Sequence, residues 1–389
     1  MKNALIIGGG PAGCCAAHQL TILNQNYNVT LVEKSNFLGG GCKTLYFGGH
    51  PYTFGPRHFL TNKKYLFDFL NKFVPMRSCH EHEFITYVSQ DDDFYNYPIN
   101  EQDIKKMPDF NKISEERKKA KGPMGAKNLE EYWINSVGKT LFSKFIENYN
   151  KKMWLLDDLK ELDTFNWSEK GPSIQKNNDK PFKDMISAYP IKLNGYDDYF
   201  SIATKGAKVL LNTVIEKYDI ENKNVFIKGK KQHFDIIINS LPPDEIFNFK
   251  FGKLPFIGRD FYPFVLPIEN VFPKDIYFIY SASSNKVTRC VEYKKFTKYK
   301  SKNSLLGIEI PTMSNRLYPI PITKFQKIAD KYFNLMPEGV YSVGRAGIYR
   351  YGVDFDRCID HAMLVADDLK NNKKGGGSVN YFYSKEEQV

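Results

Sequence analysis

The chain has 389 residues, 42% of them hydrophobic, which suffices for a packed core and for two or three structural units. It contains no run of about 18 apolar residues, so we expect no membrane span. No charged leader precedes an apolar segment at the N-terminus, so we expect no secretory signal. The six cysteines form no CxxC pair, which favours reduced cytoplasmic thiols over a disulfide framework or a metal site.

The net charge of +11 can attract nucleic acid, anionic lipid or phosphorylated small molecules. Basic runs such as residues 117–119 and 294–295 are typical of a solvated surface. The sequence carries no recognition-helix, RRM-type or zinc signature, so we expect no nucleic-acid partner. Polyanionic small molecules remain the favoured class of ligand.

The N-terminal segment predicts a βαβ unit. Residues 3–7 predict a short buried strand, a glycine-rich turn follows, and a helix is expected from about Pro11 to Leu23. Residues 28–33 predict a second buried strand that ends in Glu33.

The turn in this unit is a G-x-G-x-x-G sequence at residues 8–13, with Glu33 twenty positions beyond its last glycine. Gly8 permits the tight turn, Gly10 lets the backbone approach a pyrophosphate, and Gly13 allows the helix to pack closely on the strand. The helix N-terminus directs N–H groups at phosphates, and Glu33 can accept hydrogen bonds from ribose hydroxyls. The sequence therefore predicts a dinucleotide site.

Later segments follow in the order helix, helical unit, sheet, strand and helix. Residues 64–74 have helical spacing, and the region from about 76 to 160 is interpreted as a mostly helical insertion. Alternating and β-branched patterns from about 208 to 240 and from 260 to 312 predict strands, the latter in an antiparallel sheet. A short strand at 339–344 precedes a helix at about 355–371.

Two further elements distinguish FAD from NAD. Three glycines at residues 39–41 bring a second backbone turn near the cofactor, and Gly344-Arg345 follows a late buried strand. Together with the first fingerprint they resemble the large FAD-binding superfamily that includes amine oxidases and pyranose mutases, so we expect FAD. The expected cofactor-binding residues are Gly8, Gly10, Pro11, Ala12, Gly13, Glu33, Lys34, Gly40, Gly41, Cys42, Arg345 and Tyr351.

Several segments resemble the UDP-galactopyranose mutase family. Residues 55–62 resemble its G-P-H-I-F-H-T, and residues 149–154 its Y-T-x-x-Q-W. Residues 289–296 resemble its R-x-x-E-x-K-x-F, residues 318–320 its Y-P-I, and residues 344–351 its G-R-L-G-x-Y-R-Y. The resemblance extends from residue 3 to about residue 370.

The resemblance implies an isomerase that interconverts pyranose and furanose forms of a nucleotide sugar without net redox change. In that family reduced FAD attacks the anomeric carbon and the nucleoside diphosphate leaves. It implies that Arg289, Tyr318 and Tyr351 hold the diphosphate, with Arg57 and His58 as further catalytic candidates. The aromatic residues implied to line the substrate cleft are Phe145, Tyr149 and Trp154. A homodimer is left open.

The implied architecture is an α/β fold with a Rossmann-like FAD-binding domain, an inserted helical unit and an antiparallel sheet domain. The FAD-binding domain is expected to be discontinuous. We expect the FAD-binding domain to comprise residues 1–75, about 205–245 and 330–372, and the helical insertion to comprise about 76–160. The substrate-binding sheet is expected over about 161–204 and 246–329, with a mobile loop near 170–190. Residues 373–389 are expected to form a flexible tail.

The sequence departs from the family pattern at two places. The two family histidines of the first motif fall on Arg57 and Leu60, while His58 takes the position of the family's isoleucine. In the loop near 174–190, aligned on Phe182, Asp184 and Pro190, Ile174 stands where the family has a second diphosphate arginine. Ile186 stands where the family stacks an aromatic ring on uracil. Nearby side chains that can compensate for the charge are Gln175, Lys176 and Lys180.

A lost stacking ring matters for specificity, because base stacking is worth about 1–3 kcal/mol. We therefore expect altered specificity, with UDP, GDP or dTDP as the nucleotide. The main alternative is a flavin oxidoreductase of the amine-oxidase type, which shares the glycine motifs and the late Gly-Arg. The diphosphate-binding set around Arg289 distinguishes the two, because amine oxidation does not need it.

Overall fold

The opening βαβ unit is present as expected in a computed structural model of the chain. Strand β1 (Lys2–Ile7) leads into α1 (Pro11–Ile22), and β2 (Tyr27–Val32) pairs with β1 in parallel. The structure describes residues 1–22, 27–164, 174, 176, 182, 184–371 and 375–379. None of the helices among these residues is long and apolar enough to cross a membrane.

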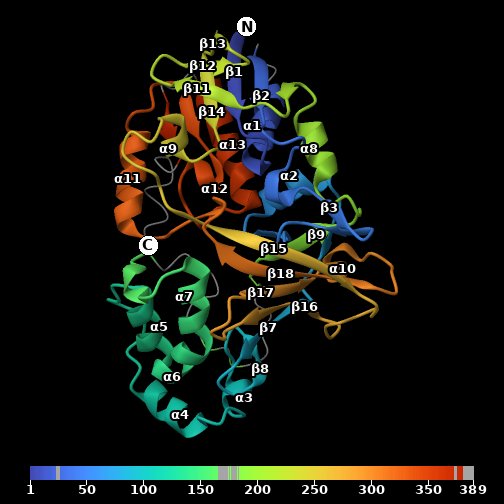
Figure 1. The fold of residues 1–389 in the computed structure, drawn as a ribbon, viewed down its shortest axis with the longest axis vertical. Helices are drawn as coiled ribbons and strands as arrows, with labels where there is room; N and C mark the ends of the chain where they lie inside the picture. Colours follow the sequence, from blue (N-terminus) through green and yellow to red (C-terminus); the bar gives the residue numbers. More distant parts are fainter. Residues whose placement is uncertain are drawn as a thin grey trace.

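Distant segments complete a six-stranded parallel sheet in the order β10-β2-β1-β14-β20-β21 (Figure 1). The added strands are β10 (Lys208–Leu210), β14 (Ile236–Asn239), β20 (Val340–Ser342) and β21 (Gly377–Ser378). Helices α1 and α13 (Phe355–Lys370) share one apolar cluster on one face of this sheet. The other face is covered by a small antiparallel sheet of β11 (Ile215–Asp219), β12 (Asn224–Ile227) and β13 (Lys230–His233). Because both faces are covered, residues 4–7 of β1 form a continuous buried apolar run.

Strand β21 differs from the expectation of a flexible tail over 373–389. Gly377 and Ser378 pair with Tyr341 and Ser342 of β20, and Val379 is fully buried. A Cβ at Gly375 would lie 1.9 Å from Asp368 Oδ2, so the glycines are needed for close approach to the rest of the fold. The glycine-rich composition predicted a flexible segment. In the structure, the lack of side chains on these glycines lets the backbone pack closely against the rest of the fold. Residues 373, 374 and 380–389 lie outside the described residues.

A seven-stranded sheet follows the predicted antiparallel pattern over most of its width, in the order β19-β15-β18-β17-β16-β7-β8. Its strands are β19 (Tyr318–Pro319), β15 (Phe256–Leu266), β18 (Ser304–Thr312), β17 (Arg289–Glu292), β16 (Ile276–Ser281), β7 (Glu83–Val88) and β8 (Asp93–Tyr97). One pair, β16 with β7, is parallel. The strands of this sheet thus come from two separate regions of the sequence, residues 83–97 and 256–319.

The region 76–160 differs from the mostly helical expectation in its first part. It begins with β6 (Met76–Ser78), β7 and β8, and burial alternates residue by residue along β7. This period of two is the pattern of a half-buried strand. Helices then follow as α3 (Glu101–Ile104), α4 (Phe110–Lys118), α5 (Leu129–Val137), α6 (Lys139–Phe142), a π turn (Ser143–Glu147) and α7 (Asn148–Trp154). They bury a separate apolar cluster around Trp133 and Trp154.

The segment expected as a loop near 170–190 ends in a strand. Residues Ile186–Pro190 form β9, which lies between β5 (Phe59–Thr61) and β6. Pairing with two neighbours satisfies the backbone groups of β9 on both edges. Residues 165–173, 175, 177–181 and 183 lie outside the described residues, including Gln175 and Lys180.

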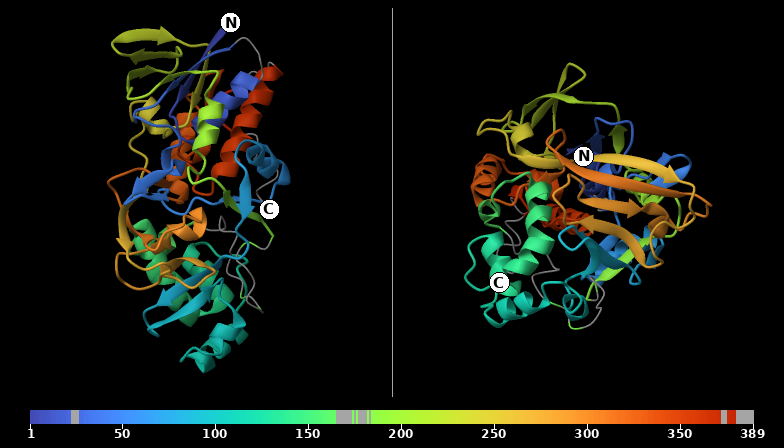
Figure 2. Two further views of the ribbon diagram at one scale, coloured as in Figure 1. Left: turned by 90° about the vertical axis from the view of Figure 1, so that its right-hand side faces the viewer. Right: turned by 60° about the horizontal axis from the view of Figure 1, so that its bottom comes forward.

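The elements are arranged in three levels, which Figures 1 and 2 show from three directions. The parallel sheet lies at the N-terminal end, the seven-stranded sheet in the middle, and α3–α7 at the far end. The remaining elements are a 3-10 turn (Gly40–Cys42), β3 (Leu45–Phe47), β4 (His50–Tyr52), α2 (Lys64–Phe73), a 3-10 turn (Leu159–Glu161), α8 (Asp197–Ala203), α9 (Pro243–Ile246), α10 (Tyr293–Thr297), α11 (Thr323–Phe333) and α12 (Gly344–Gly347).

We predict that Gly13→Ala destabilises the fold and that Gly10→Ala does not. A Cβ at Gly13 would lie 1.9 Å from the Gly8 carbonyl oxygen, whereas a Cβ at Gly10 meets nothing within 4 Å. Overpacking against backbone should lower the free energy of unfolding by about 2 kcal/mol or more for Gly13→Ala. Gly10→Ala should stay within about 0.5 kcal/mol of the parent. Urea unfolding followed by circular dichroism measures both, and equal losses would contradict the close helix–strand contact.

Candidate active site

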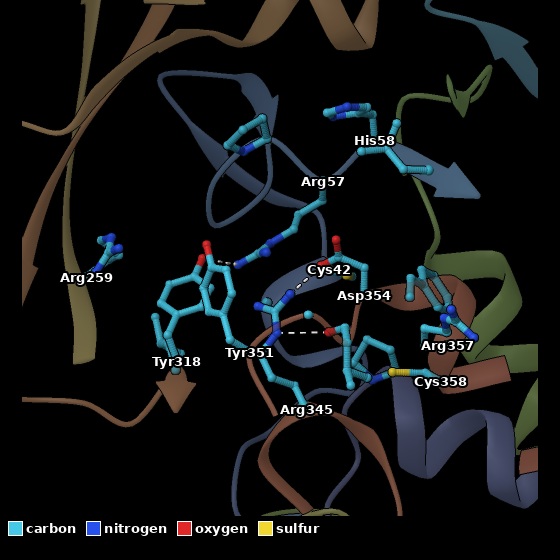
Figure 3. Close-up of a pocket in the computed structure, with 18 of the residues that line it drawn as sticks. Cys42, Arg57, His58, Arg259, Tyr318, Arg345, Tyr351, Asp354, Arg357 and Cys358 are labelled. Carbon is cyan, nitrogen blue, oxygen red and sulfur yellow. Dashed lines mark hydrogen bonds and ion pairs between the residues drawn. The ribbon is translucent and has the colours of Figure 1, made fainter. Parts of the chain in front are cut away.

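A cavity of about 740 Å³ lies between the parallel sheet and the seven-stranded sheet (Figure 3). One wall is formed by the turns that follow β1, β14 and β20, which are the carboxyl ends of parallel strands. This is where open α/β sheets bind ligands. The opposite wall is formed by residues from β15, β17, β18 and β19. The volume is within the range usual for sites that bind small molecules and cofactors.

Most of the predicted site residues line this cavity. Those that do are Gly10, Pro11, Ala12, Gly40, Gly41, Cys42, Arg57, His58, Tyr149, Arg289, Tyr318, Arg345 and Tyr351. Four other candidates are not among the residues that line the cavity: Gly8, Gly13, Glu33 and Lys34, of which Lys34 is exposed. The structure places Phe145 and Trp154 in the apolar core of the helical unit. The Trp154 ring packs edge-to-face against Tyr351, which lines the cavity, with ring centroids 4.9 Å apart.

The glycine-rich turn has the geometry that a dinucleotide needs. Gly8 has φ +95°, a conformation that favours glycine, and α1 begins at Pro11. The space above Gly10 is open, and Gly40, with φ +50°, approaches its Cα. The backbone can therefore come close to a pyrophosphate at the N-terminus of α1.

Glu33 stabilises this turn through two hydrogen bonds from backbone N–H groups. Its Oε2 accepts a hydrogen bond from the Gly9 N–H at 2.6 Å, and its Oε1 accepts one from the Ser35 N–H at 2.7 Å. Each carboxylate oxygen has a further lone pair. The carboxylate can thus hold the loop and still accept hydrogen bonds from ribose hydroxyls.

Arg289 on β17 is directly opposite Glu309 on β18 in the sheet register. Its Nε lies 3.1 Å from Glu309 Oε1, and its Nη2 lies 2.7 Å from Oε2. Burial opposes the charge, but Glu309 holds the pKa of Arg289 well above its ordinary value. Bidentate pairing fixes the plane of the guanidinium in the cavity wall.

Tyr318 is buried among arginines. Arg57 Nη2 lies 3.5 Å from its hydroxyl, and the guanidinium carbons of Arg259 and Arg345 lie 4.8 and 5.0 Å from its ring centroid. The Tyr351 ring lies beside it, with centroids 5.7 Å apart (Figure 3). Burial raises the pKa of Tyr318, but the positive charges of Arg57, Arg345 and Arg259 outweigh it and lower the pKa to about 8.

Arg345 connects the late Gly-Arg motif to the acidic residues after it. Its Nε donates a hydrogen bond to the Val353 carbonyl at 2.9 Å, and its Nη2 forms an ion pair with Asp354. Burial and the nearby Asp354 raise the pKa of Asp356 to about 6. This end of the cavity therefore has alternating basic and acidic groups.

The positions that depart from the family pattern lie on different parts of the site. His58 lines the cavity and stacks on Phe296, with centroids 5.5 Å apart. Leu60 also lines the cavity, while Ile186 is half-buried on β9, opposite Thr61. Ile174 packs on the apolar core of the helical unit. Lys176 is exposed.

Four charged residues that line the cavity were missed in the sequence: Arg259, Glu309, Arg316 and Arg357. Arg259 on β15 and Glu309 on β18 both line the cavity, with 3% of each residue exposed. The signal that could have indicated them is a charged residue inside an apolar strand, since charges are almost never fully buried without a partner or ligand. Among the described residues, no cluster of three or more His, Cys, Asp or Glu is arranged to hold a metal ion.

We predict that Tyr318 ionises about two pH units below an ordinary tyrosine, whose pKa is about 10. Between these two pKa values the unfolded state binds more protons than the folded state, so this group adds stability as pH rises from about 8 to about 10. Ultraviolet titration should show tyrosinate forming near pH 8 in the parent protein and not in Tyr318→Phe. Identical titration curves for the two proteins would contradict the arginine environment.

Family models and curated proteins match this chain over most of its length. The family model of UDP-galactopyranose mutase matches residues 144–351, and that of an NAD(P)-binding Rossmann-like domain matches residues 6–73. A probable UDP-galactopyranose mutase of Klebsiella pneumoniae is 24% identical over 95% of this chain and 94% of its own length. A dTDP-fucopyranose mutase of Escherichia coli is also 24% identical, over 96% of this chain and 100% of its own length.

Solved structures show the same fold. A reduced UDP-galactopyranose mutase superposes with a TM-score of 0.80 and 16% identity, covering 97% of this chain and 95% of the other. A putative protoporphyrinogen oxidase from Exiguobacterium superposes with a TM-score of 0.69 and 13% identity, covering 96% of this chain and 99% of the other. With the family model spanning more than half of the sequence, the chain belongs to the UDP-galactopyranose mutase family, whose members are flavin-dependent isomerases.

Proposed function

We propose that this protein interconverts the pyranose and furanose forms of a nucleoside diphosphate sugar, with reduced FAD as its cofactor. The observation that carries the proposal is a single cavity with two different walls. The dinucleotide turn around Gly10 lies on one wall, and the group formed by Arg289, Tyr318 and Tyr351 lies on the other. A cofactor and a diphosphate could therefore meet there.

The residues present fit FAD. The open space above Gly10 at the N-terminus of α1 provides a cradle that a side chain at residue 10 would fill, and Gly40 and Gly344 line the same cavity. Arg345, next to Gly344 in the chain, lines the same cavity and can donate hydrogen bonds to a cofactor. When bound and reduced, FAD supplies a nucleophile for the anomeric carbon.

The chain's own residues would act on the leaving group. Arg289 presents a planar guanidinium whose orientation is fixed by Glu309, which therefore acts as a positioning residue. The hydroxyls of Tyr318 and Tyr351 can donate hydrogen bonds to phosphate oxygens. Positioned donors in a buried site stabilise the charge that develops as the diphosphate departs, and they hold it for recapture.

We also propose that the substrate differs from UDP-galactopyranose. Two relatives have the same identity to this chain, and their names give different substrates. One is a probable UDP-galactopyranose mutase and the other is a dTDP-fucopyranose mutase. Ile186 has no aromatic ring to stack on a base, and Leu60 cannot form hydrogen bonds inside the cavity. A cytoplasmic location and a homodimeric assembly remain predictions from the sequence.

A substrate panel tests this proposal. Dithionite-reduced protein is incubated with UDP-, GDP- and dTDP-sugars, and the ring isomers are separated. We expect turnover of at least one nucleotide sugar, with a better substrate than UDP-galactopyranose. Clean turnover of UDP-galactopyranose with no better substrate would contradict the altered specificity. Absence of turnover, together with no effect of any nucleoside diphosphate on the flavin spectrum, would favour an amine-oxidase type of oxidoreductase.

For Arg289→Ala we predict that flavin is retained and that turnover falls by about 10²-fold or more, as for loss of one preorganised donor. The substitution also leaves Glu309 buried without its partner, so Arg289→Ala/Glu309→Ala is the matched control that removes both charges. Steady-state turnover and flavin content are measured for the parent and both variants. Near-normal turnover in either would exclude Arg289 from the reaction.

A further inference from the structure

The arginines that line the cavity differ in their counter-ions. Four of them form ion pairs with carboxylates: Arg289 with Glu309, Arg316 with Asp244 and Glu245, Arg345 with Asp354, and Arg357 with Asp360. The other two, Arg57 and Arg259, have no ion pair with any residue that the structure describes. The charge of the paired arginines is largely offset before any ligand arrives.

Arg259 is the more deeply buried of these two, with 3% of the residue exposed. It lies on β15 two residues from Phe261, which is opposite Glu309 in the sheet register. Because side chains alternate along a strand, Arg259 is on the same face as Glu309, and therefore also as Arg289, which is opposite Glu309. That face forms the cavity wall.

The contacts of Arg259 leave its charge unmatched. Its Nη1 donates a hydrogen bond to the Gly258 carbonyl at 2.6 Å, and its Nη2 contacts the Met153 sulfur, which is a weak acceptor. A guanidinium has five N–H donors, and burying its charge without an anion is costly. A buried arginine on a cavity wall with these neighbours indicates a site for an anionic ligand.

Arg57 approaches the same point from the other side. Figure 3 shows Arg57 and Arg259 on opposite sides of Tyr318. Arg57 Nη2 lies 3.5 Å from the Tyr318 hydroxyl, and the Arg259 guanidinium lies 4.8 Å from the centroid of its ring. The two unpaired charges therefore converge on one tyrosine.

We propose that Arg57 and Arg259 form an anion clamp across Tyr318 that binds the phosphates of the nucleotide substrate, with Arg259 supplying the decisive positive charge. The inference rests on the proposed function, in which the substrate carries a diphosphate. In this arrangement Arg289 contributes orientation, because Glu309 offsets its charge, whereas Arg259 contributes net electrostatic attraction.

The test measures binding rather than turnover. Isothermal titration of FAD-loaded protein with UDP, GDP and dTDP identifies the nucleoside diphosphate that binds most tightly. Arg259→Met should weaken binding of that probe by on the order of 10- to 100-fold, as for loss of a charge-assisted hydrogen bond. Binding of the corresponding nucleoside, which has no phosphate, should stay within about twofold. Arg259→Lys keeps the charge and should lie between the parent and Arg259→Met.

Arg357→Met is the charge-matched control, because it removes one positive charge from the lining of the same cavity. Its partner Asp360 stays compensated by Lys63 and by the Tyr65 hydroxyl, each at 2.8 Å. Diphosphate binding by this variant should change by less than about threefold, because Asp360 already offsets the charge of Arg357. Flavin content and melting temperature verify that each variant is folded.

The outcomes separate the two proposals. A parent protein that binds no nucleoside diphosphate contradicts the proposed function itself. A parent that binds one, with unchanged affinity in Arg259→Met, overturns the anion clamp. Equal losses for diphosphate and nucleoside would also overturn it, because they would indicate a general disturbance of the cavity. If Arg259→Met does not fold, Arg259→Gln removes the same charge in a polar side chain, and unchanged diphosphate affinity in that variant overturns the anion clamp.

Discussion

The concentration of several guanidinium groups around one cavity is the constraint on which the rest of the site depends. A buried charge is tolerated only when a partner or a ligand compensates it. Glu309 compensates Arg289 and Asp354 compensates Arg345, whereas Arg259 is left for a ligand. The positions of acidic residues therefore decide which arginines orient an anion and which attract it. The lowered pKa of Tyr318 is a consequence of the same concentration of positive charge.

Two sheets with different roles bring the two walls together. The parallel sheet supplies glycine-rich turns at its strand ends, where backbone N–H groups are available and side chains are absent. The seven-stranded sheet supplies long side chains from adjacent strands, and its register places Arg289 directly opposite Glu309. Backbone N–H donors allow a cofactor to approach closely, because no side chain stands in the way. Long side-chain donors can reach the phosphates of a substrate that binds and is released in each turnover.

The fold alone does not decide the chemistry. A putative protoporphyrinogen oxidase superposes on almost the whole chain, as does a UDP-galactopyranose mutase. Such proteins share the layered architecture and the dinucleotide turn, and the reaction depends on the side chains that face the cofactor. In this chain those side chains include a fixed arginine–carboxylate pair and two arginines without a carboxylate partner among the described residues, which favour a diphosphate over an uncharged amine.

The sequence by itself determined the features that depend on local order: the βαβ opening, the G-x-G-x-x-G turn and the motifs around Arg289, Tyr318 and Tyr351. Each of these features can be predicted because the spacing of residues along the chain indicates either a local conformation or a resemblance to a family. Only the tertiary structure decided the rest. Strand β21 and the surroundings of Arg259 depend on strand pairings between segments far apart in the sequence. The burial of a side chain depends on which residues those pairings place over it. Local periodicity contains no information about such contacts, so it could not indicate which charges are buried without a counter-ion.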